Sequence, residues 1–411
     1  MLPMISQEDQ FQSRFGSAPI LRIEAPGRVN LIGEHIDYLD GWVMPAAIEP
    51  RITLLAAPGA ESGGIEIWSE EQGDSQHQLS SCDFTPRAKP EEAWLNYPIG
   101  VLGSYAEHGV TLPASRVAIF SSVPAGAGLS SSAALETAMA LLIEALSGQP
   151  CSTLERALRC QKAEHEWVGV PCGIMDQLSV GGGVKGHVLF IDCQSLDIEA
   201  IPFPANIQMV VAESGVQHAL ADGEYAKRRR DCEAALKTLA KASWRDITLA
   251  LVKQSRDQLG EHLFRRARHV VTEMQRVTDF CTALKSGHPE ELPALMRAGH
   301  DSLRDDYEVT CPELDFLVDS GFDFGVSHGH FGSRMTGGGF GGSTIHLVHE
   351  SATSAYLEHL RSRYREAFNR DLNCFVTTAS DCAQCTTIFP TSKPTPERQL
   401  DSNCLSPSIQ S

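Results

Sequence analysis

The sequence predicts an α+β fold with two domains. Its 411 residues are enough for two domains and a substantial core. Strand-like and helix-like segments occur in both halves, without the regular alternation of a doubly wound sheet, and no internal repeat is visible. We expect a first domain over residues 1–200, a second over 201–390, and a disordered tail over 391–411, which is rich in Pro and Ser.

In the first half, apolar runs alternate with polar loops. Residues 116–121 (RVAIFS) are mostly apolar and predict a buried strand. A Gly-rich loop follows, and residues 131–146 have the apolar spacing of a long helix. Further strands are expected at 21–24, 52–56 and 187–192, short ones within 58–90, and further helices at 94–106 and 152–168.

The second half predicts a strand at 207–212, a helix at 225–241 and helices across 255–320. A strand at 343–348 follows a second Gly-rich segment, residues 335–342 (MTGGGFGG). This segment contains the GxGxxG pattern. It precedes a strand instead of opening a helix, so it does not predict a dinucleotide site. It is either a flexible turn or a loop that approaches a ligand from the second half.

The composition limits the partners. The chain has 34 basic and 52 acidic residues, a net charge of −18, which argues against nucleic acid or an anionic membrane. The N-terminus has no apolar run of signal-peptide length. The most apolar helical run, residues 133–146, carries Glu136 and Glu144 and is too short to span a bilayer. We therefore expect a cytoplasmic protein.

The cysteines predict thiols and not a disulfide scaffold. Twelve cysteines in 411 residues are few for such a scaffold, and in a reducing compartment most should be buried. Cys382 and Cys385 form a lone CxxC, with Cys374 nearby. A zinc site would need a second pair of comparable spacing, so metal binding here is a minor alternative.

A Gly- and Ser-rich loop, residues 123–134 (VPAGAGLSSSAA), lies between a predicted strand and a predicted helix. Glycines let the backbone approach a ligand, and a helix N-terminus offers unpaired N–H groups and the positive end of its dipole. The serines add hydroxyl groups, one of which could ligate Mg²⁺. The P-loop lysine is absent. The pattern fits a phosphate site, and equally a glycine turn with a serine N-cap.

A group of ionisable residues suits acid–base chemistry. Glu164 lies on a predicted helix, and Asp176 in a loop flanked by Gly and Pro, where a nearby cation could tune it as a general base. The segment at 26–38 (PGRVNLIGEHIDY) adds Arg28, Glu34, His35 and Asp37. Together with a phosphate loop, these are the groups required for phosphoryl transfer to a sugar.

Three motifs in this order resemble those of the galactokinases, a family of the GHMP small-molecule kinases. PGRVNLIGEHIDY resembles the galactokinase signature, VPAGAGLSSSAALE the second GHMP motif, and RMTGGGFGGS the third. Further similarity lies between the motifs and covers nearly all of residues 10–390. The resemblance implies a two-domain GHMP-kinase fold with the active site in the cleft between the domains.

The resemblance also implies a role for each matching residue. Asp176 would be the base that takes the proton from the anomeric hydroxyl of α-D-galactose. Arg28 would keep it ionised and help to stabilise the transition state. The sugar would be held by Glu34, His35, Asp37, Gly173 and Tyr225. The ATP phosphates would be held by Gly126, Ala127, Gly128, Leu129, Ser130, Ser131 and Ser132, with Mg²⁺ on Ser131 and Glu164, and the adenine would be enclosed by Trp94. The products would be α-D-galactose 1-phosphate and ADP. The basic run 227–230 indicates a helix face near the site, not a nucleic-acid patch.

Three residues depart from the family pattern. Ile36 stands where galactokinases usually have Thr, Leu39 where they usually have Asn, and Ser343 where Cys is common. Ile36 and Leu39 flank the expected sugar ligands. They either change which sugar fits, or face away from the site and pack.

The leading prediction is an ATP- and Mg²⁺-dependent galactokinase that works as a monomer or weak dimer. One alternative is an anomeric kinase of a related sugar, N-acetylgalactosamine or L-arabinose. Another is a non-catalytic sensor of sugar and ATP, against which the intact phosphate loop, Arg28 and Asp176 argue. A kinase of the homoserine or mevalonate type would not explain the segment GEHIDY.

Overall fold

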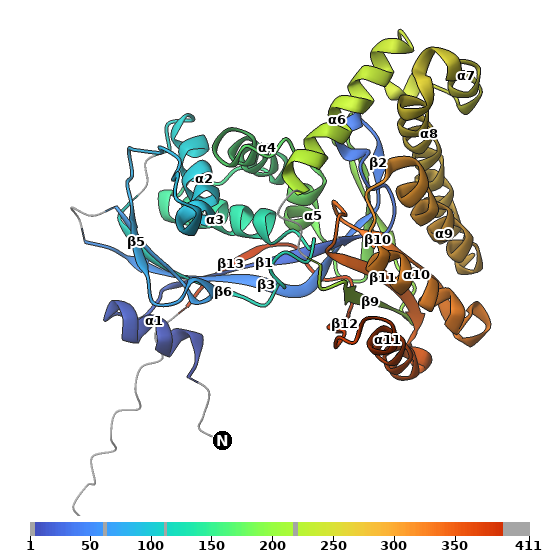
Figure 1. Ribbon diagram of the computed structural model, residues 1–411. Helices are drawn as coiled ribbons and strands as arrows, with labels where there is room; N and C mark the ends of the chain where they lie inside the picture. The colour runs from blue at the N-terminus through green and yellow to red at the C-terminus, as the bar shows by residue number, and fades with distance from the viewer. Residues whose placement is uncertain (1–4, 61–63, 111–112, 217–220, 389–411) are drawn as a thin grey trace, which may run out of the picture.

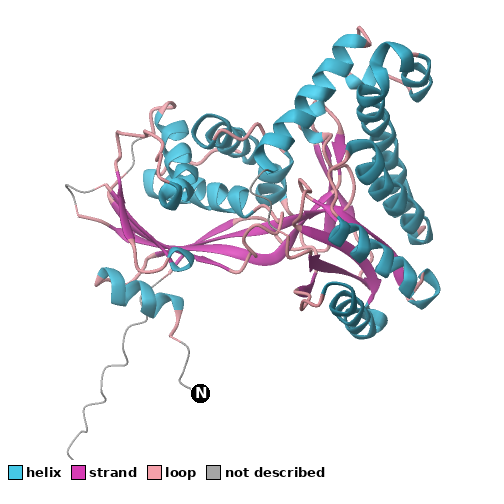
Figure 2. Ribbon diagram, viewed as in Figure 1, coloured by secondary structure: helices cyan, strands magenta, loops and turns pink. Residues whose placement is uncertain are grey.

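The computed structural model describes residues 5–60, 64–110, 113–216 and 221–388. The expected disordered tail lies outside the described residues. The strands form three sheets, and helices pack on them in both halves of the chain (Figures 1 and 2). Neighbouring strands are antiparallel except for one parallel pair, β4 and β6. The α+β prediction is therefore confirmed.

The first sheet has six strands in the order β13-β1-β3-β6-β4-β5. Their bounds are β1 Leu21–Asn30, β3 Pro45–Pro58, β4 Ile65–Ser69, β5 Gln76–Leu79, β6 Ser115–Ser121 and β13 Gln384–Thr387. The pairing of β1 with β3 shifts between Pro26 and Arg28. At this bulge, a Cβ on Gly27 would lie 2.8 Å from the carbonyl oxygen of Leu129, so only glycine lets the strand approach the loop before α3 this closely.

Helices cover both faces of the first sheet, because β3 alternates between two apolar faces. Leu54 and Ala56 join the main core, whereas Leu55 and Ala57 pack with Phe11 of α1. Figure 1 shows α1 on one face and the bundle of α2, α3 and α4 on the other. The bounds are α1 Gln7–Phe15, α2 Asn96–Ala106, α3 Ser131–Ser147, α4 Thr153–Ala163 and α5 Met175–Gly182.

Two smaller sheets complete the structure. One contains β2 (Trp42–Val43), β7 (His187–Asp192) and β8 (Ile198–Pro202). The other has the order β10-β11-β9-β12, with β9 Ile207–Glu213, β10 His330–Thr336, β11 Ser343–His349 and β12 Cys374–Thr377. The second half also contains α6 Ala221–Thr238, α7 Leu249–Gln254, α8 Arg256–Ser286, α9 Leu292–Ser302, α10 Pro312–Phe324 and α11 Thr353–Phe368. Figure 1 shows α10 and α11 beside the four-stranded sheet.

Most expected elements are present, and one correction affects the site. The helix expected at 152–168 is α4 followed by one π-helical turn, Glu164–Val168. Asp176 was expected in a loop, but it lies in the first turn of α5. The loop prediction was wrong because the glycines and proline at 169–173 precede this helix, and Met175 and Leu178 begin a short apolar face. The helices α1 and α11 were not predicted.

The end of the described chain returns to the first sheet. Residues 384–387 form β13, which pairs antiparallel with residues 21–24 of β1. A boundary near residue 200 still separates most of the two sets of elements. We propose this division of the chain, with β13 placed by its hydrogen bonds in the first unit.

The CxxC segment does not form a recognisable metal site. Cys374 lies in β12 and Cys385 in β13, which belong to different sheets. Among the described residues, no group of three or more His, Cys, Asp and Glu side chains could hold a metal ion. Most of the described cysteines are buried free thiols. Of the helices that the structure describes, none is both long and apolar enough to cross a membrane.

Candidate active site

The residues expected to bind the sugar and to carry catalysis line one cavity of about 150 Å³. Both halves of the chain contribute to its wall: Arg28, Glu34, His35, Asp37, Glu164, Gly173 and Asp176 from the first half, and Tyr225, Gly337 and Gly338 from the second. The second Gly-rich segment therefore does approach the site from the second half. The sequence had left this open.

Arg28 and Asp176 form a two-point ion pair at the centre of the cavity wall. Arg28 Nε donates to Oδ1 of Asp176 at 2.7 Å, and Nη2 donates to Oδ2 at 2.7 Å. The hydroxyl of Ser130 also donates to Oδ2. The remaining Nη1 of Arg28 donates to the carbonyl oxygen of Gly128 at 2.7 Å. This arrangement fixes the carboxylate, and it joins Asp176 to the phosphate loop through both Arg28 and Ser130.

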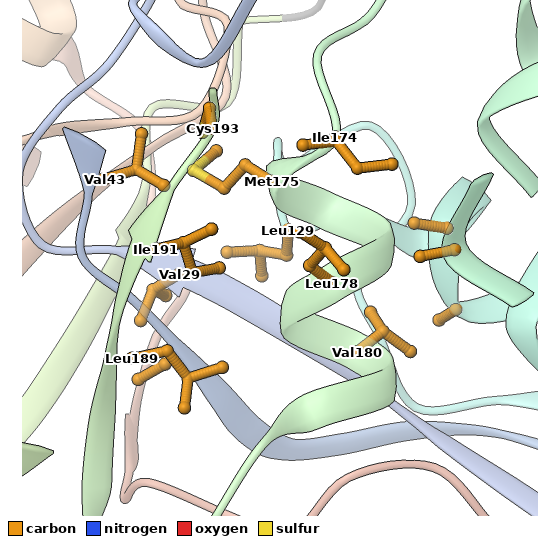
Figure 3. Close-up of a cluster of buried hydrophobic side chains, with 14 of the residues drawn as sticks. Val29, Val43, Leu129, Ile174, Met175, Leu178, Val180, Leu189, Ile191 and Cys193 are labelled. Atoms are coloured by element: carbon orange, nitrogen blue, oxygen red, sulfur yellow. The ribbon is translucent and has the colours of Figure 1, made fainter. Parts of the chain in front are cut away.

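Packing of α5 on two strands holds Asp176 in place. Met175 and Leu178 are buried and belong to the main core, together with Val29 of β1 and Ile191 of β7. Figure 3 shows these side chains gathered between α5 and the two strands, with Leu129 of the phosphate loop beside them. The apolar side of α5 thus anchors the helix, and the half-buried Asp176 projects toward the cavity.

Two further carboxylates in the cavity are in unusual environments. Burial raises the pKa of Glu34 to about 7, although Arg334 acts in the opposite direction. Burial, and then the neighbouring Asp176, raise the pKa of Asp37 to about 7. A Cβ on Gly173 would lie 1.9 Å from Oδ2 of Asp37, so the backbone at Gly173 is in close contact with this carboxylate. Asp37 and Gly173 therefore form one wall of the cavity.

His35 is bonded to the protein through both ring nitrogens. Nε2 lies 3.0 Å from the carbonyl oxygen of Gly338, which can only accept, so Nε2 carries the proton. Nδ1 then accepts from Tyr38 Oη at 2.9 Å, and Tyr38 accepts from Tyr307 Oη at 2.9 Å. Burial lowers the pKa of His35 to about 4, so the ring is neutral. A hydrogen bond from His35 to a sugar hydroxyl would require one of these bonds to break.

Tyr225 on α6 completes the wall on the side of the second half. Its ring centroid lies 5.3 Å from that of His35 and 5.2 Å from that of Tyr38. Two residues of the basic run on the same helix bond to backbone carbonyls of other segments. Arg228 is buried and donates to the carbonyl oxygen of Tyr307 at 2.7 Å, and Arg229 donates to that of Pro171 at 3.0 Å.

The Gly- and Ser-rich loop, residues 123–134, leads into α3. No side chain of the N-cap residue bonds to the first backbone N–H groups of this helix. Gly126 and Gly128 have φ values of 69° and 73°, which glycine adopts readily. Ser130, the residue before the helix, has φ 59° and bonds to Asp176, and within the described residues no side chain caps α3. The alternative of a simple serine N-cap is therefore wrong. Ala127 and Leu129 are buried, so these two residues offer a ligand their backbone only.

The second Gly-rich segment packs against the phosphate loop. A Cβ on Gly337 would lie 2.7 Å from the carbonyl oxygen of Gly128, and Gly337 has φ 80°. Ser343, one of the departures from the family pattern, donates its hydroxyl to the carbonyl oxygen of Ala127 at 2.8 Å. The side chain at this position therefore supports the phosphate loop from the second half.

The donors available for a divalent cation lie beside Asp176. Glu164 is buried, and its Oε2 accepts from Gln177 Nε2 at 2.9 Å. Burial, and then the charge of Asp176, raise the pKa of Glu164 to about 7. Oε1 of the nearby buried Glu136 has no hydrogen-bond partner within the described residues. Carboxylate oxygens are the type of donor that Mg²⁺ binds, but the described residues bring no three potential ligands together around one point. Ser131 is half-buried at the start of α3 and is not one of the residues lining the cavity.

Three other sequence-predicted positions lie away from the cavity. Trp94 lies on the 3₁₀ turn before α2, and its buried Nε1 has no partner within the described chain. Ile36 is fully buried and Leu39 is 6% exposed, and both belong to the main hydrophobic core. Neither residue lines the cavity, so the structure supports packing over a direct effect on the sugar.

The sequence did not predict the buried residues that contact the Gly33–Glu34 segment without lining the cavity. Arg334 of β10 forms a 2.5 Å ion pair with Glu34, and Glu273 of α8 accepts from the backbone N–H of Gly33 at 2.8 Å. Arg334 belongs to the third motif, which is the one signal that could have drawn attention to it. Glu273 lies in a long helix with many charged residues, and nothing in its local sequence distinguishes it.

Comparison with known proteins agrees with this geometry. Residues 9–58 match the galactokinase galactose-binding signature, residues 96–183 the N-terminal domain of GHMP kinases, and residues 280–366 their C-terminal domain. The galactokinase of Canis lupus familiaris is 42% identical over 358 residues, covering 86% of this chain and 90% of the relative. That of Roseiflexus is 40% identical over 388 residues, covering 93% and 97%.

Solved structures give the same result. The crystal structure of Lactococcus lactis galactokinase complexed with galactose has a TM-score of 0.86 and 30% identity, covering 92% of this chain and 98% of the relative. A mevalonate kinase with a TM-score of 0.58 and 18% identity shares the fold. With these identities, and with all three motifs gathered at one site, the chain belongs to the galactokinase family of the GHMP kinases and is an ATP-dependent sugar kinase.

Proposed function

We propose that this enzyme transfers the γ-phosphate of ATP to the anomeric hydroxyl of α-D-galactose, giving α-D-galactose 1-phosphate and ADP. One observation carries the proposal. The Arg28–Asp176 pair lies in the same cavity as Glu34 and Asp37 and is bonded directly to the phosphate loop. A base, hydroxyl acceptors and an anion site are thus adjacent, which is the arrangement that phosphoryl transfer to a sugar needs.

Asp176 acts as the general base in this proposal. The anomeric oxygen attacks the γ-phosphorus while its proton passes to the carboxylate of Asp176. The new O–P bond forms as the bond from the γ-phosphorus to the bridging oxygen breaks, and ADP leaves. Arg28 orients the carboxylate of Asp176 through two hydrogen bonds and offsets the charge of the transferred group. Ser130 orients the carboxylate, since its hydroxyl donates to Oδ2.

The remaining cavity residues select the sugar. Glu34 and Asp37 accept hydrogen bonds from sugar hydroxyls, while the backbone of Gly173 and the ring of Tyr225 bound the pocket. We assign His35 to shaping the pocket, because both of its ring nitrogens are already bonded to protein. Its family role as a direct ligand of the sugar stays a prediction.

The proposed ATP-binding residues come mainly from the second motif. The loop from Gly126 to Ser132 would hold the phosphates through its backbone N–H groups and the N-terminus of α3. Glu164 and Ser131 would hold Mg²⁺, which would neutralise phosphate charge when bound. Trp94 would enclose the adenine, and its unpartnered Nε1, judged within the described chain, is compatible with a ligand contact.

The alternatives lose most of their support. A kinase of N-acetylgalactosamine or L-arabinose was considered because of Ile36 and Leu39, and these side chains lie in the core. A non-catalytic sensor would not need the intact Arg28–Asp176 pair. A cytoplasmic location and a monomeric or weakly dimeric state stay predictions.

The experiment that tests the proposal is ADP release with MgATP against a panel of sugars. The panel contains galactose, 2-deoxygalactose, N-acetylgalactosamine, arabinose, glucose and fucose. We expect galactose to have the highest kcat/KM. Preference for another sugar would overturn the proposed substrate, and no ADP release with any of them would overturn the proposed chemistry.

A further inference from the structure

Glu34 lines the sugar cavity, and a buried arginine from the other half of the chain forms an ion pair with its carboxylate, whose oxygens accept no hydrogen bond within the described residues. Arg334 of β10 is fully buried, and its Nη2 lies 2.5 Å from Oε2 of Glu34, which is 1% exposed. The two residues are 300 positions apart in sequence. A buried carboxylate needs such a partner, because removing an ion from water costs several kcal/mol.

The same arginine is held by a second buried carboxylate. Nη1 of Arg334 lies 3.0 Å from Oε1 of Glu273, which is also fully buried. That Oε1 accepts from the backbone N–H of Gly33 at 2.8 Å, and Arg276 Nε donates to the other oxygen at 2.7 Å. His269 Nε2 lies 3.2 Å from the carbonyl oxygen of Glu34. Groups on α8 and β10 therefore hold both the backbone and the side chain of the Gly33–Glu34 segment.

We propose that Arg334 is a positioning residue for sugar recognition, which favours the ionised form of Glu34 and directs its carboxylate at the substrate. The inference rests on the proposed role of Glu34 in sugar binding. Arg334 does not line the cavity, and the polar contacts of its side chain within the described residues are with Glu34, Glu273 and the carbonyl oxygen of Leu31. Its removal should therefore affect the sugar and not ATP.

The charges around Glu34 predict a specific pH signature. Burial raises the pKa of Glu34, Arg334 opposes this more strongly than Arg28 does, Glu273 adds to it, and the net pKa is about 7. Without Arg334, Glu34 should hold its proton to higher pH. A protonated Glu34 has one acceptor fewer for sugar hydroxyls, so sugar affinity should recover only when the pH is raised further.

The test compares Arg334→Met and Arg334→Lys with the wild-type enzyme from about pH 6 to 9. The readouts are the KM for galactose, the KM for ATP and kcat. We expect Arg334→Met to raise the galactose KM roughly tenfold at neutral pH, with the ATP KM within about twofold, and to move its pH dependence upward. Arg334→Lys should restore part of the affinity, since the charge remains.

Arg156→Met is the matched control. Arg156 pairs with buried Glu144 at 2.7 Å through Nη2 and does not line the cavity. It should lower stability without moving the galactose KM. An unchanged galactose KM in Arg334→Met, or a loss that is equal at every pH, would overturn the inference.

Two further measurements keep the proposals separable. If the Arg334 variants do not fold, the galactose KM of the wild-type enzyme should change more steeply with pH near neutrality than that of Glu34→Gln, in which Asp37 and Glu164 still titrate in the cavity wall near this pH. Identical pH profiles for the two proteins would overturn the inference. If the wild-type enzyme does not phosphorylate galactose, the proposed function fails as well. Phosphorylation of galactose with normal sugar KM in the Arg334 variants would remove only the positioning role.

Discussion

At the scale of single residues, the site depends on how Asp176 is held. Its two oxygens accept two hydrogen bonds from Arg28 and one from Ser130. These contacts fix the carboxylate before any substrate arrives, so little reorganisation is needed when a proton is transferred. Arg28 lies in β1 and Ser130 directly precedes α3, so Asp176 is bonded both to the first sheet and to the Gly- and Ser-rich loop.

Asp176→Asn should remove most turnover while leaving binding largely intact. The amide keeps the shape of the carboxylate but cannot take a proton at neutral pH. We expect kcat to fall by roughly a hundredfold or more, the usual contribution of a general base, with modest changes in either KM. Steady-state kinetics would measure this, and near-normal kcat would remove Asp176 from the role of base.

Asp192→Asn is the control for this change. Asp192 forms a comparable two-point pair with Arg245, at 2.7 Å through Nη1, and does not line the cavity. This variant should keep wild-type kcat. Equal losses in both variants would show that the effect comes from breaking a carboxylate–arginine pair and not from losing a base.

At the scale of elements, the contact between the two Gly-rich loops matters most. Gly337 packs on Gly128, and Ser343 at the start of β11 donates to the carbonyl of Ala127. The second half therefore supports the phosphate loop by backbone contact and one hydroxyl. A side chain other than the usual cysteine performs this role here.

Ser343→Ala should weaken ATP binding selectively. Loss of the bond to Ala127 costs about 0.5–1.5 kcal/mol, which corresponds to roughly a two- to tenfold rise in the KM for ATP. The galactose KM should stay unchanged. Thr344→Ala is the neighbouring control, because Thr344 Oγ1 bonds to the carbonyl of Ala212 at 3.3 Å, away from the loop. An ATP KM that rises equally in both variants would contradict the prediction.

The segment around η1, the 3₁₀ turn Asp37–Leu39, is anchored in the main hydrophobic core. Ile36 is fully buried and lies against Gly41, whose N–H donates to the Ile36 carbonyl at 2.8 Å. Leu39 is 6% exposed. These side chains hold the turn that carries Asp37, and they do so from the side facing the core.

Changing both residues to the usual family types should destabilise the enzyme without changing its sugar preference. Ile36→Thr with Leu39→Asn places a hydroxyl and an amide in an apolar core, at a cost of about 2–5 kcal/mol. Urea unfolding and the sugar panel measure the two effects. Leu154→Asn, at a 39% exposed position, should be nearly neutral. A change in sugar preference would contradict the assignment of Ile36 and Leu39 to packing.

At the scale of the whole molecule, buried titratable groups act on stability in opposite directions. Burial lowers the pKa of His35 to about 4, of His269 to about 3 and of His330 to about 4. Below about pH 6.5 the unfolded chain therefore binds protons at these histidines that the folded chain does not, and stability falls.

The carboxyl groups whose pKa values are raised by burial oppose this effect of the histidines on stability. Glu34, Asp37 and Glu164, with pKa values of about 7, hold protons in the folded chain between about pH 4.5 and 7 that the unfolded chain has lost. Their contribution is present at low pH and disappears as the pH rises through 7. Burial also lowers the pKa values of His300 and His346, and it raises those of Glu136 and Glu213, so five groups act in each direction.

We expect the free energy of unfolding to change little between about pH 5 and 6.5 and to fall steeply below about pH 4.5. Below that pH, carboxyls of the unfolded chain are protonated as well. Burial alone would raise the pKa of Glu273, but Arg334 and Arg276 hold it well below its usual range. Glu273 therefore binds a proton in the folded chain only at a lower pH than in the unfolded chain. Urea unfolding at fixed ionic strength checks the profile. A steady loss of several kcal/mol from pH 7 to 5 would contradict it.

Much of the fold was predictable because its signals are local. Apolar periodicity located β6, α3 and α4, and three ordered motifs identified the family and the residues that line the cavity. Asp176 was assigned to a loop and lies in α5, since this helix is only eight residues long and follows a Gly- and Pro-containing loop. Short helices give weak periodic signals, and packing on β1 and β7 decides that this one forms.

The sequence by itself determined the family, the α+β class and which of the expected sugar-binding and catalytic residues meet in one cavity, because these are encoded in contiguous motifs whose chemistry is specific. The tertiary structure decided which way the side chains face and what stands behind them. Ile36 and Leu39 lie in the hydrophobic core, and both ring nitrogens of His35 are bonded to protein atoms. Arg334, 300 positions away in the sequence, forms an ion pair with Glu34. Such pairings depend on burial and on contacts between segments remote in sequence, and neither periodicity nor motif spacing records them.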